Sequence, residues 1–453
     1  MNKKTLGGFF GALAAIAAVI VAHNTGGKPA TPPPAWPTPA VLAMWQETCR
    51  AVMHEHRNRD ITDGELTGCV QVARGGGQVE QLRLWVDALP ADPVPAIPMP
   101  LRLRVDGRFW ATDAGTFRPL FTSALTILAK SPEQRAAVLD EDQALGFNGI
   151  RVFAGSLAWA GQTPEQARAV LPTLLDEAAQ RGLYVYVVAL TDTATGYDIG
   201  GHLRAVAEIV AGHNNAVLEI ANEIGHPTQS SRVNDPANLR TLAQGIVPSG
   251  VVWSLGAILA QDEPIDGRYQ GSGGSFVTAH LDRGRDKWNQ VRRIREIAAL
   301  SEAVRVPAMS GEPIGASENA QAGKRENDPA FFFALGVLSR LFEVGTVFHS
   351  DDGLNARPLG PRQKACAVAF VAGFRAIGSE SRLTFKNATW GDSPIAGADF
   401  NRVARAYSGV SGNEGWLVLV GLTGDPALRW GNGWSDRGLV GEMPGIQVRH
   451  IGR

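Results

Sequence analysis

Short apolar runs rich in β-branched and aromatic residues alternate with longer amphipathic stretches along most of the chain. This alternation is typical of parallel strands joined by crossover helices. The run LYVYVVAL at 183–190 has no polar alternation, as expected for a strand covered on both faces. The eight predicted strands are residues 118–125, 148–153, 183–190, 216–221, 251–255, 275–280, 306–310 and 345–350.

Capping residues predict helices between these strands. Ser131 before Pro132, and Thr163 before Pro164, mark two helix starts. Other amphipathic runs predict helices at 203–213, 286–300, 328–345 and 361–376. The stretch 256–274 after the fifth strand looks like a loop, so no helix is evident there. Eight βα repeats within about 260 residues, with no GxGxxG after the first strand, favour an α/β fold of the (β/α)8 TIM-barrel type over an open sheet.

Changes in composition predict the domain boundaries. In residues 1–22, basic residues, an apolar core and small residues follow one another as in a secretory signal. The apolar run is also nearly long enough for an uncleaved membrane anchor. We therefore expect a secreted or periplasmic protein, or one held at a membrane by its first segment. The predicted segments are a signal peptide or anchor (1–22), a Pro-rich linker (23–40), a small helical module (41–90), the barrel (101–378) and a β-rich C-terminal extension packed on it (379–453).

Composition narrows the classes of function. A formal net charge of −1 with 19% charged residues predicts no surface for nucleic acid. The nine histidines include no HExxH and no cysteine pair has metal-ligand spacing, so neither a metal nor an organic cofactor is predicted. Cys49 and Cys69 are candidates for a disulfide if the chain is exported; the alternative is three reduced thiols, including Cys366.

Polar residues at the carboxyl ends of barrel strands face the active site. Glu223 follows the fourth predicted strand and Glu312 the seventh, while Arg151 lies near the end of the second. Two facing carboxylates suit acetal hydrolysis, because one donates a proton to the leaving oxygen and the other stays ionised to meet the sugar carbon. Arg151 near Glu312 would keep that carboxylate ionised, whereas burial and the second carboxylate would raise the pKa of Glu223.

Three motifs resemble a known group of enzymes. LGFNGIRVF, LEIANEIGHP and VPAMSGEPIG are similar to the second, fourth and seventh strand motifs of clan A glycoside hydrolases, most of all to glycoside hydrolase family 5, the cellulase-like family. The resemblance covers about residues 101–375 and implies a retaining enzyme on a (β/α)8 barrel. It implies Glu223 as acid/base, Asn222 as a sugar-binding companion, Glu312 as nucleophile and Arg151 as the supporting cation.

The chain departs from that pattern at three places. Ile224 stands where the clan commonly has proline, no histidine follows the third strand, and VFHSDDG replaces the aromatic residue usual after the eighth strand. The leader LRLRVDGRFW resembles the β-hairpin that precedes the first strand in many clan members.

Other candidates for substrate binding lie at strand ends and in rim loops. They are His280, His349, Trp159 and Tyr197. Aromatic rings stack on the C–H faces of sugars, but each of these residues also has a structural alternative, a satisfied buried histidine or an aromatic residue of the core. Asn222 and Glu223 have one as well, a helix cap and a first-turn charge.

The sequence thus predicts a retaining glycoside hydrolase that cleaves O-glycosidic bonds of a β-linked polysaccharide or oligosaccharide by double displacement, without a cofactor. The alternative is a catalytically inactive carbohydrate-binding barrel that serves as an accessory of a cell surface or virion.

Overall fold

The computed structural model describes most of the chain beyond residue 98. The described residues are 99–257, 274–280, 287–321, 325–378, 382–386, 395–397, 405–423, 428–430 and 433–453, with a few between 46 and 70. The chain forms two compact units, Met1–Pro95 and Ala96–Arg453. The predicted segments 1–22 and 23–40 lie outside the described residues. Among the described residues, no helix is both long and apolar enough to cross a membrane.

A disulfide joins Cys49 and Cys69 in the first unit. This confirms the pairing that the sequence left open against three reduced thiols. Cys366 is free and buried, and burial is the main reason why the pKa of its thiol is raised to about 12. Most of the predicted helical module at 41–90 lies outside the described residues.

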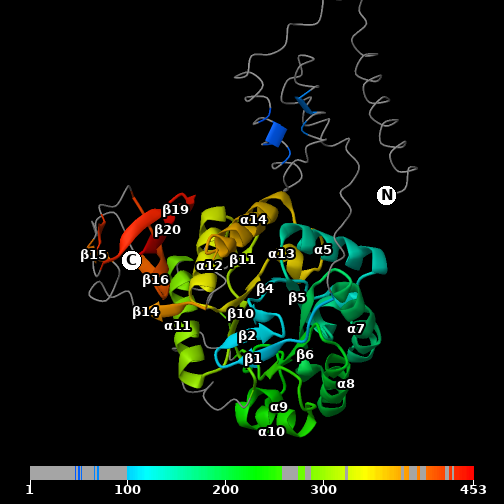
Figure 1. Cartoon of the computed structure of the whole chain (residues 1–453). Helices are drawn as coiled ribbons and strands as arrows, with labels where there is room; N and C mark the ends of the chain where they lie inside the picture. The colour runs from blue at the N-terminus through cyan, green and yellow to red at the C-terminus, as the bar shows by residue number, and fades with distance from the viewer. Residues whose placement is uncertain are drawn as a thin grey trace, which may run out of the picture. The chain divides into compact units, whose positions relative to one another are not determined.

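Eight parallel strands form the centre of the second unit (Figure 1). Their order in the sheet is β8-β7-β6-β5-β4-β13-β10-β9. Beyond the ladder, the backbone N–H groups of Ser275 and Phe276 donate to the carbonyl of Trp253 at 2.7 and 3.3 Å, so the two ends of the order meet. The strands are β4 (Leu120–Ser123), β5 (Gly149–Phe153), β6 (Tyr184–Leu190), β7 (Ala216–Ala221), β8 (Trp253–Ser254), β9 (Val277–His280), β10 (Ala308–Glu312) and β13 (Gly345–Phe348). All eight predicted strands, and the (β/α)8 barrel, are confirmed.

Helices surround the barrel. Ser131 and Thr163 both form capping boxes, with Gln134 and Gln166, as their sequence context predicted. The helices between strands are α5 (Pro132–Leu145), α6 (Leu157–Ala160), α7 (Pro164–Ala179), α8 (Ile199–Ala211), α9 (Ser231–Asn234), α10 (Pro236–Ile246), α11 (Lys287–Val304), α12 (Pro329–Leu341), α13 (Asp351–Leu354) and α14 (Pro361–Arg375), with 3-10 turns η1 (Ile127–Ala129) and η2 (Thr193–Thr195).

The sequence analysis missed α10. Its start carries the same signal as the predicted helices, because the side chain of Asp235 accepts from the backbone N–H of Ala237 at 2.8 Å and Pro236 is the first helical residue. Most of the loop-like stretch 256–274 lies outside the described residues.

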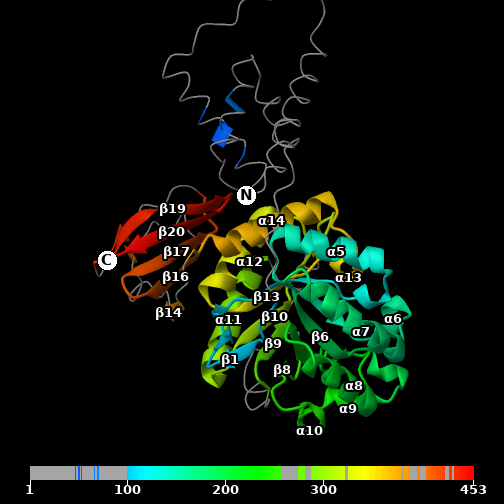
Figure 2. The same cartoon turned by 45° about the vertical axis from the view of Figure 1, so that its right-hand side comes forward.

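The amino-terminal end of the barrel is closed by a hairpin and an apolar layer. The interior layer contains Phe121, Tyr186, Phe276 and Met309, and Trp110 of the hairpin packs against Phe276 at 4.7 Å between ring centroids. The hairpin strands are β1 (Arg104–Asp106), β2 (Phe109–Thr112) and β3 (Gly115–Phe117). Figure 2 shows the hairpin at the left of the barrel and α6, α9 and α13 at its right. The predicted site residues lie at the opposite, carboxyl end of the strands.

A five-stranded antiparallel sheet follows the barrel, which confirms the β-rich extension. Tyr407 packs edge-on against Phe342, just after α12, at 5.6 Å between ring centroids. Gly409 leaves no room for a side chain, because a Cβ there would lie 2.9 Å from the Leu341 side chain. The order is β14 (Thr384–Lys386), β16 (Arg405–Ser411), β17 (Glu414–Val420), β20 (Ile446–Gly452) and β19 (Ser435–Met443); short strands are β11 (Gly315–Ala316), β12 (Arg325–Glu326), β15 (Ile395–Gly397) and β18 (Arg429–Trp430).

A buried histidine links two of the surrounding helices to the barrel. His202 of α8 is 2% exposed, its Nδ1 accepts from Arg168 Nη1 at 2.7 Å, and its Nε2 donates to the carbonyl of Ala189 at 3.0 Å. These partners require a neutral ring, since arginine can only donate. Burial is the main cause that lowers the pKa of His202 to about 4.

We expect this histidine to make the folded unit less stable in acid. Below the ordinary pKa of 6.5, His202 is protonated in the unfolded chain but stays neutral in the folded unit. The free energy of unfolding therefore falls as the pH drops from 6.5 to about 4. The loss should approach about 3 kcal/mol. Urea unfolding of wild type and His202→Gln across this window measures it; a wild-type minus variant difference that does not change with pH would contradict the assignment.

Candidate active site

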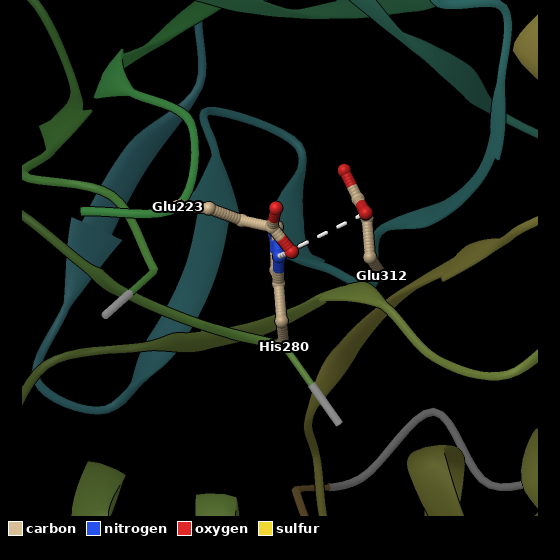
Figure 3. Close-up of side chains that lie close together, drawn as sticks. All are labelled: Glu223, His280 and Glu312. Atoms are coloured by element: carbon tan, nitrogen blue, oxygen red, sulfur yellow. Dashed lines mark hydrogen bonds and ion pairs between the residues drawn. The ribbon is translucent and has the colours of Figure 1, made fainter. Parts of the chain in front are cut away.

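Glu223, His280 and Glu312 meet at the carboxyl end of the barrel (Figure 3). Glu223 follows β7, and His280 and Glu312 end β9 and β10. His280 and Glu312 are register partners, after an irregularity between Ser310 and Glu312 that breaks the regular pairing. Such bulges redirect a side chain at the end of a strand. Here the redirected carboxylate points toward the other two side chains.

The backbone turns sharply after β7. Glu223 has a φ of 41°, and its carbonyl accepts from the backbone N–H of His226 at 2.9 Å. The N–H of Ile224 donates to the carbonyl of Ala257 at 2.7 Å. Gly256 is required beside this turn, because it has a φ of 120° and a Cβ would lie 1.9 Å from the carbonyl oxygen of Ala221. These contacts thus stabilise the left-handed backbone conformation of Glu223.

This turn decides between the two interpretations of the Asn222–Glu223 pair. The next helix, α9, begins at Ser231, so Asn222 is not a helix cap and Glu223 is not a first-turn charge. Gln229, which is only 5% exposed, instead ties the loop to the end of β7, because its Nε2 donates to the carbonyl of Asn222 at 2.5 Å. The acid therefore stands at the end of a barrel strand.

The three side chains are close enough to act on one substrate bond. One ligand atom each of Glu223, His280 and Glu312 lies within 4.8 Å of the other two. His280 Nδ1 is 3.2 Å from Glu223 Oε1 and 3.9 Å from Glu312 Oε2. The gap between the carboxylates is close to the roughly 5–5.5 Å typical of retaining glycosidases, and well below the roughly 6.5–9.5 Å typical of inverting ones.

Arg151 lies fully buried beneath this group and bonds to both sides of it. Its Nη1 donates to Glu312 Oε1 at 2.7 Å, and its Nη2 donates to Asn222 Oδ1 at 2.9 Å. Its Nε and Nη2 donate to Glu219 Oε2 at 3.1 and 2.9 Å. Burial alone would lower the pKa of Arg151, but the charges of Glu219 and Glu312 outweigh burial and the pKa is raised. Arg151 therefore stays charged and favours ionised Glu312.

Glu219 is a site residue that the sequence analysis missed. It is fully buried on β7, four residues before Glu223, and it occupies one edge of the Arg151 guanidinium so that Nη1 is left to meet Glu312. The available signal was a single charged residue inside the apolar run AVLEIA. A buried charge needs a partner, but the run itself does not say which.

Glu223, His280 and Glu312 are residue types that bind metals, and one ligand atom of each lies within 4.8 Å of the other two. The buried positive charge of Arg151, whose Nη1 lies 2.7 Å from Glu312 Oε1, disfavours a further cation at this place.

The other predicted binding residues differ in exposure. Trp159 of α6 is 61% exposed at the rim. Tyr197 is half-buried and donates its hydroxyl to the carbonyl of Thr191 at 3.1 Å, and burial raises the pKa of this hydroxyl. His349 is 0% exposed, with Gly315 packed close to its ring. His349 is thus shielded from solvent and Tyr197 directs its hydroxyl at the backbone, and their roles in substrate binding stay predictions.

A further histidine lies beside the acid. His226 Nε2 is 3.9 Å from Glu223 Oε2, and its side chain is 36% exposed. The backbone N–H of Thr228 donates to Nδ1 at 3.3 Å, which leaves the proton of the neutral ring on Nε2, the atom nearer Glu223. His226 lies in the loop that begins at Ile224, the residue that stands where clan A enzymes commonly have proline.

We expect loss of Glu219 to destabilise the barrel. Glu219→Ala removes the acceptor of two buried N–H groups of Arg151, which should lower the free energy of unfolding by about 3 kcal/mol. The matched control is Glu165→Ala, because Glu165 pairs with Arg168 at 3.2 Å but its side chain is 69% exposed; its loss should lower the free energy of unfolding far less, since solvent screens an exposed ion pair. Urea unfolding of both variants gives the comparison, and equal losses would contradict the role given to Glu219.

The comparisons with known proteins concern the fold. No family model and no curated protein matches the sequence. A solved structure described as a glycoside hydrolase has a TM-score of 0.57 at 12% identity, over 78% of this chain and 97% of its own. A glycoside hydrolase family 5 structure from Bacteroides vulgatus ATCC 8482 has a TM-score of 0.54 at 14% identity, over 78% and 93%.

A third structure, a putative glycoside hydrolase from the same organism, has a TM-score of 0.54 at 11% identity, over 80% of this chain and 84% of its own. At such identities the similarity is one of architecture. The (β/α)8 fold that the strand motifs implied is thereby confirmed: the architecture of this chain is similar to that of these glycoside hydrolase structures, one of them from family 5.

Proposed function

We propose that the protein is a retaining glycoside hydrolase that cleaves O-glycosidic bonds of a β-linked polysaccharide or oligosaccharide by double displacement. One observation carries the proposal: carboxylate oxygens of Glu223 and Glu312 lie within 4.8 Å of each other at the carboxyl end of the barrel, where Glu312 is paired with the buried Arg151 and Glu223 lies against His280. The two carboxylates thus have different surroundings, which is what acid and nucleophile require.

In the first step, ionised Glu312 attacks the anomeric carbon. A bond forms between its carboxylate oxygen and that carbon while the bond to the leaving oxygen breaks, and protonated Glu223 gives its proton to the leaving oxygen. In the second step, Glu223 takes a proton from water, the water oxygen bonds to the anomeric carbon, and Glu312 leaves as a carboxylate. Two inversions restore the original configuration.

The neighbours of the two acids support these roles. Asn222 accepts from Arg151 through Oδ1, so its amide N–H groups are directed to other acceptors, of which a sugar hydroxyl is one. His280 Nδ1 lies 3.2 Å from Glu223 Oε1, and a proton on this nitrogen would stabilise Glu223 in the ionised state that the second step needs. Arg151 acts through Glu312 and does not reach the substrate, because it is fully buried.

We also propose that residues 1–22 direct the chain out of the cytoplasm. The disulfide between Cys49 and Cys69 supports this, because disulfides persist in oxidising compartments.

Chemical rescue tests the nucleophile. Glu312→Ala should hydrolyse 2,4-dinitrophenyl β-glycosides about 10³-fold or more slowly than wild type. Azide should restore turnover by occupying the space of the lost carboxylate, and the product should be a glycosyl azide of inverted configuration. Product NMR and the release of dinitrophenolate, over a panel of aryl sugars, measure both effects.

Glu223→Ala serves as the complementary variant. Its loss should be about 10²–10⁴-fold on substrates with a poor leaving group and much smaller on dinitrophenyl glycosides, which need no proton. Glu208→Ala, an exposed glutamate on α8, is the control and should match wild type. Wild-type rates in Glu312→Ala, or no turnover of any glycoside by the unaltered protein, would refute the proposal.

A further inference from the structure

The loop after β5 forms a fixed platform at the barrel rim. The backbones of Ser156 and Gln162 bond to each other in both directions at 3.2 and 3.3 Å, which closes the loop on itself. Asp192 Oδ2 accepts from the backbone N–H of Ala158 at 3.0 Å, and the Thr191 hydroxyl donates to the carbonyl of Gly155 at 2.5 Å. The four-residue helix α6 is thus anchored to the end of β6.

This platform presents an indole ring to solvent. Trp159 is 61% exposed, while one face of its ring lies against Phe153, with 6.3 Å between ring centroids and 22° between ring planes. Phe153 is itself 5% exposed and belongs to the barrel core. A flat ring held against a buried partner keeps one face open at little cost in side-chain entropy, which is the arrangement that stacking on a rigid ligand needs.

One buried ring links the indole of Trp159 to the candidate active site. The guanidinium carbon of Arg151 lies 5.5 Å from the ring centroid of Phe153, so a single ring separates Trp159 from the cation that holds Glu312. In the order of the eight strands, β5 stands opposite β9, the strand of His280. In Figure 2, α6 lies at the same end of the barrel as α9 and α13.

We propose that Trp159 is an aromatic sugar-binding subsite, and that the substrate is an extended glycan rather than a disaccharide or a small glycoside. This inference rests on the proposed function, which places the cleaved glycosidic bond of the glycan between Glu223 and Glu312. A sugar unit held between Glu223 and Glu312 sits on the β9 side of the barrel, so a linear chain must extend beyond that unit to reach the indole on the β5 side. The C–H face of a pyranose is the apolar, flat surface that an exposed indole stacks on.

Binding without turnover tests the subsite separately from catalysis. Full-length Glu312→Gln serves as the reference, and Glu312→Gln with Trp159→Ala as the test variant. Titration calorimetry uses disaccharides and hexasaccharides of β-1,4-glucan, β-1,4-mannan, β-1,4-xylan and β-1,3-glucan. For the hexasaccharide that binds, Trp159→Ala should weaken affinity about two- to tenfold, Trp159→Phe should weaken it less, and disaccharide binding should not change.

The control is Leu439→Ala in the same background, which trims a 46% exposed apolar side chain on β19 and should leave hexasaccharide affinity unchanged. Equal hexasaccharide affinities with and without Trp159 would overturn the subsite, and so would the absence of binding to every hexasaccharide. Hexasaccharide binding that depends on Trp159, in a wild-type protein that turns over no glycan, would uphold the subsite and reject the proposed hydrolysis.

Discussion

The buried guanidinium of Arg151 is the interaction on which the candidate site depends. A cation inside a closed barrel is stable only when its N–H groups have acceptors and its charge has counter-charges. Glu219 and Asn222 of the β7 segment take one edge, and Glu312 of β10 takes the remaining nitrogen. One side chain of β5 thereby sets the relative position of two distant strand ends. It also gives the two carboxylates different surroundings, because Glu312 is paired with Arg151 while Glu223 lies against His280.

Polarity changes in layers along the barrel axis. The hairpin closes one end over an apolar layer that includes Phe276 and Met309. Above it, the hydroxyls of Tyr186, Thr278 and Ser254 bond to one another at 2.5 and 2.9 Å. The Arg151 network follows, and the carboxylates of Glu223 and Glu312 come last. Interior side chains of parallel barrels come in such layers, and here their order restricts charged chemistry to the carboxyl end.

Much of the fold was predictable because its strands and its helix starts are each encoded by residues close together in the sequence. Buried parallel strands read as apolar runs and helix starts carry caps, so all eight strands and the capping boxes at Ser131 and Thr163 were predicted correctly. The helix α10 was overlooked although Asp235 and Pro236 carry the same signal. Glu219 could not be found in this way, because a lone acid in an apolar strand does not reveal its partner.

The sequence by itself determined the class of fold and the strand ends at which Glu223 and Glu312 stand, since periodicity and order along the chain are enough to place residues on strands. Only the tertiary structure decided which side chains meet. The separation of the carboxylates, the burial of His349 and the exposure of Trp159 depend on how the sheet closes, on a bulge in β10 and on the turn at Glu223. These features arise from contacts between segments far apart in the chain, and no local pattern encodes them.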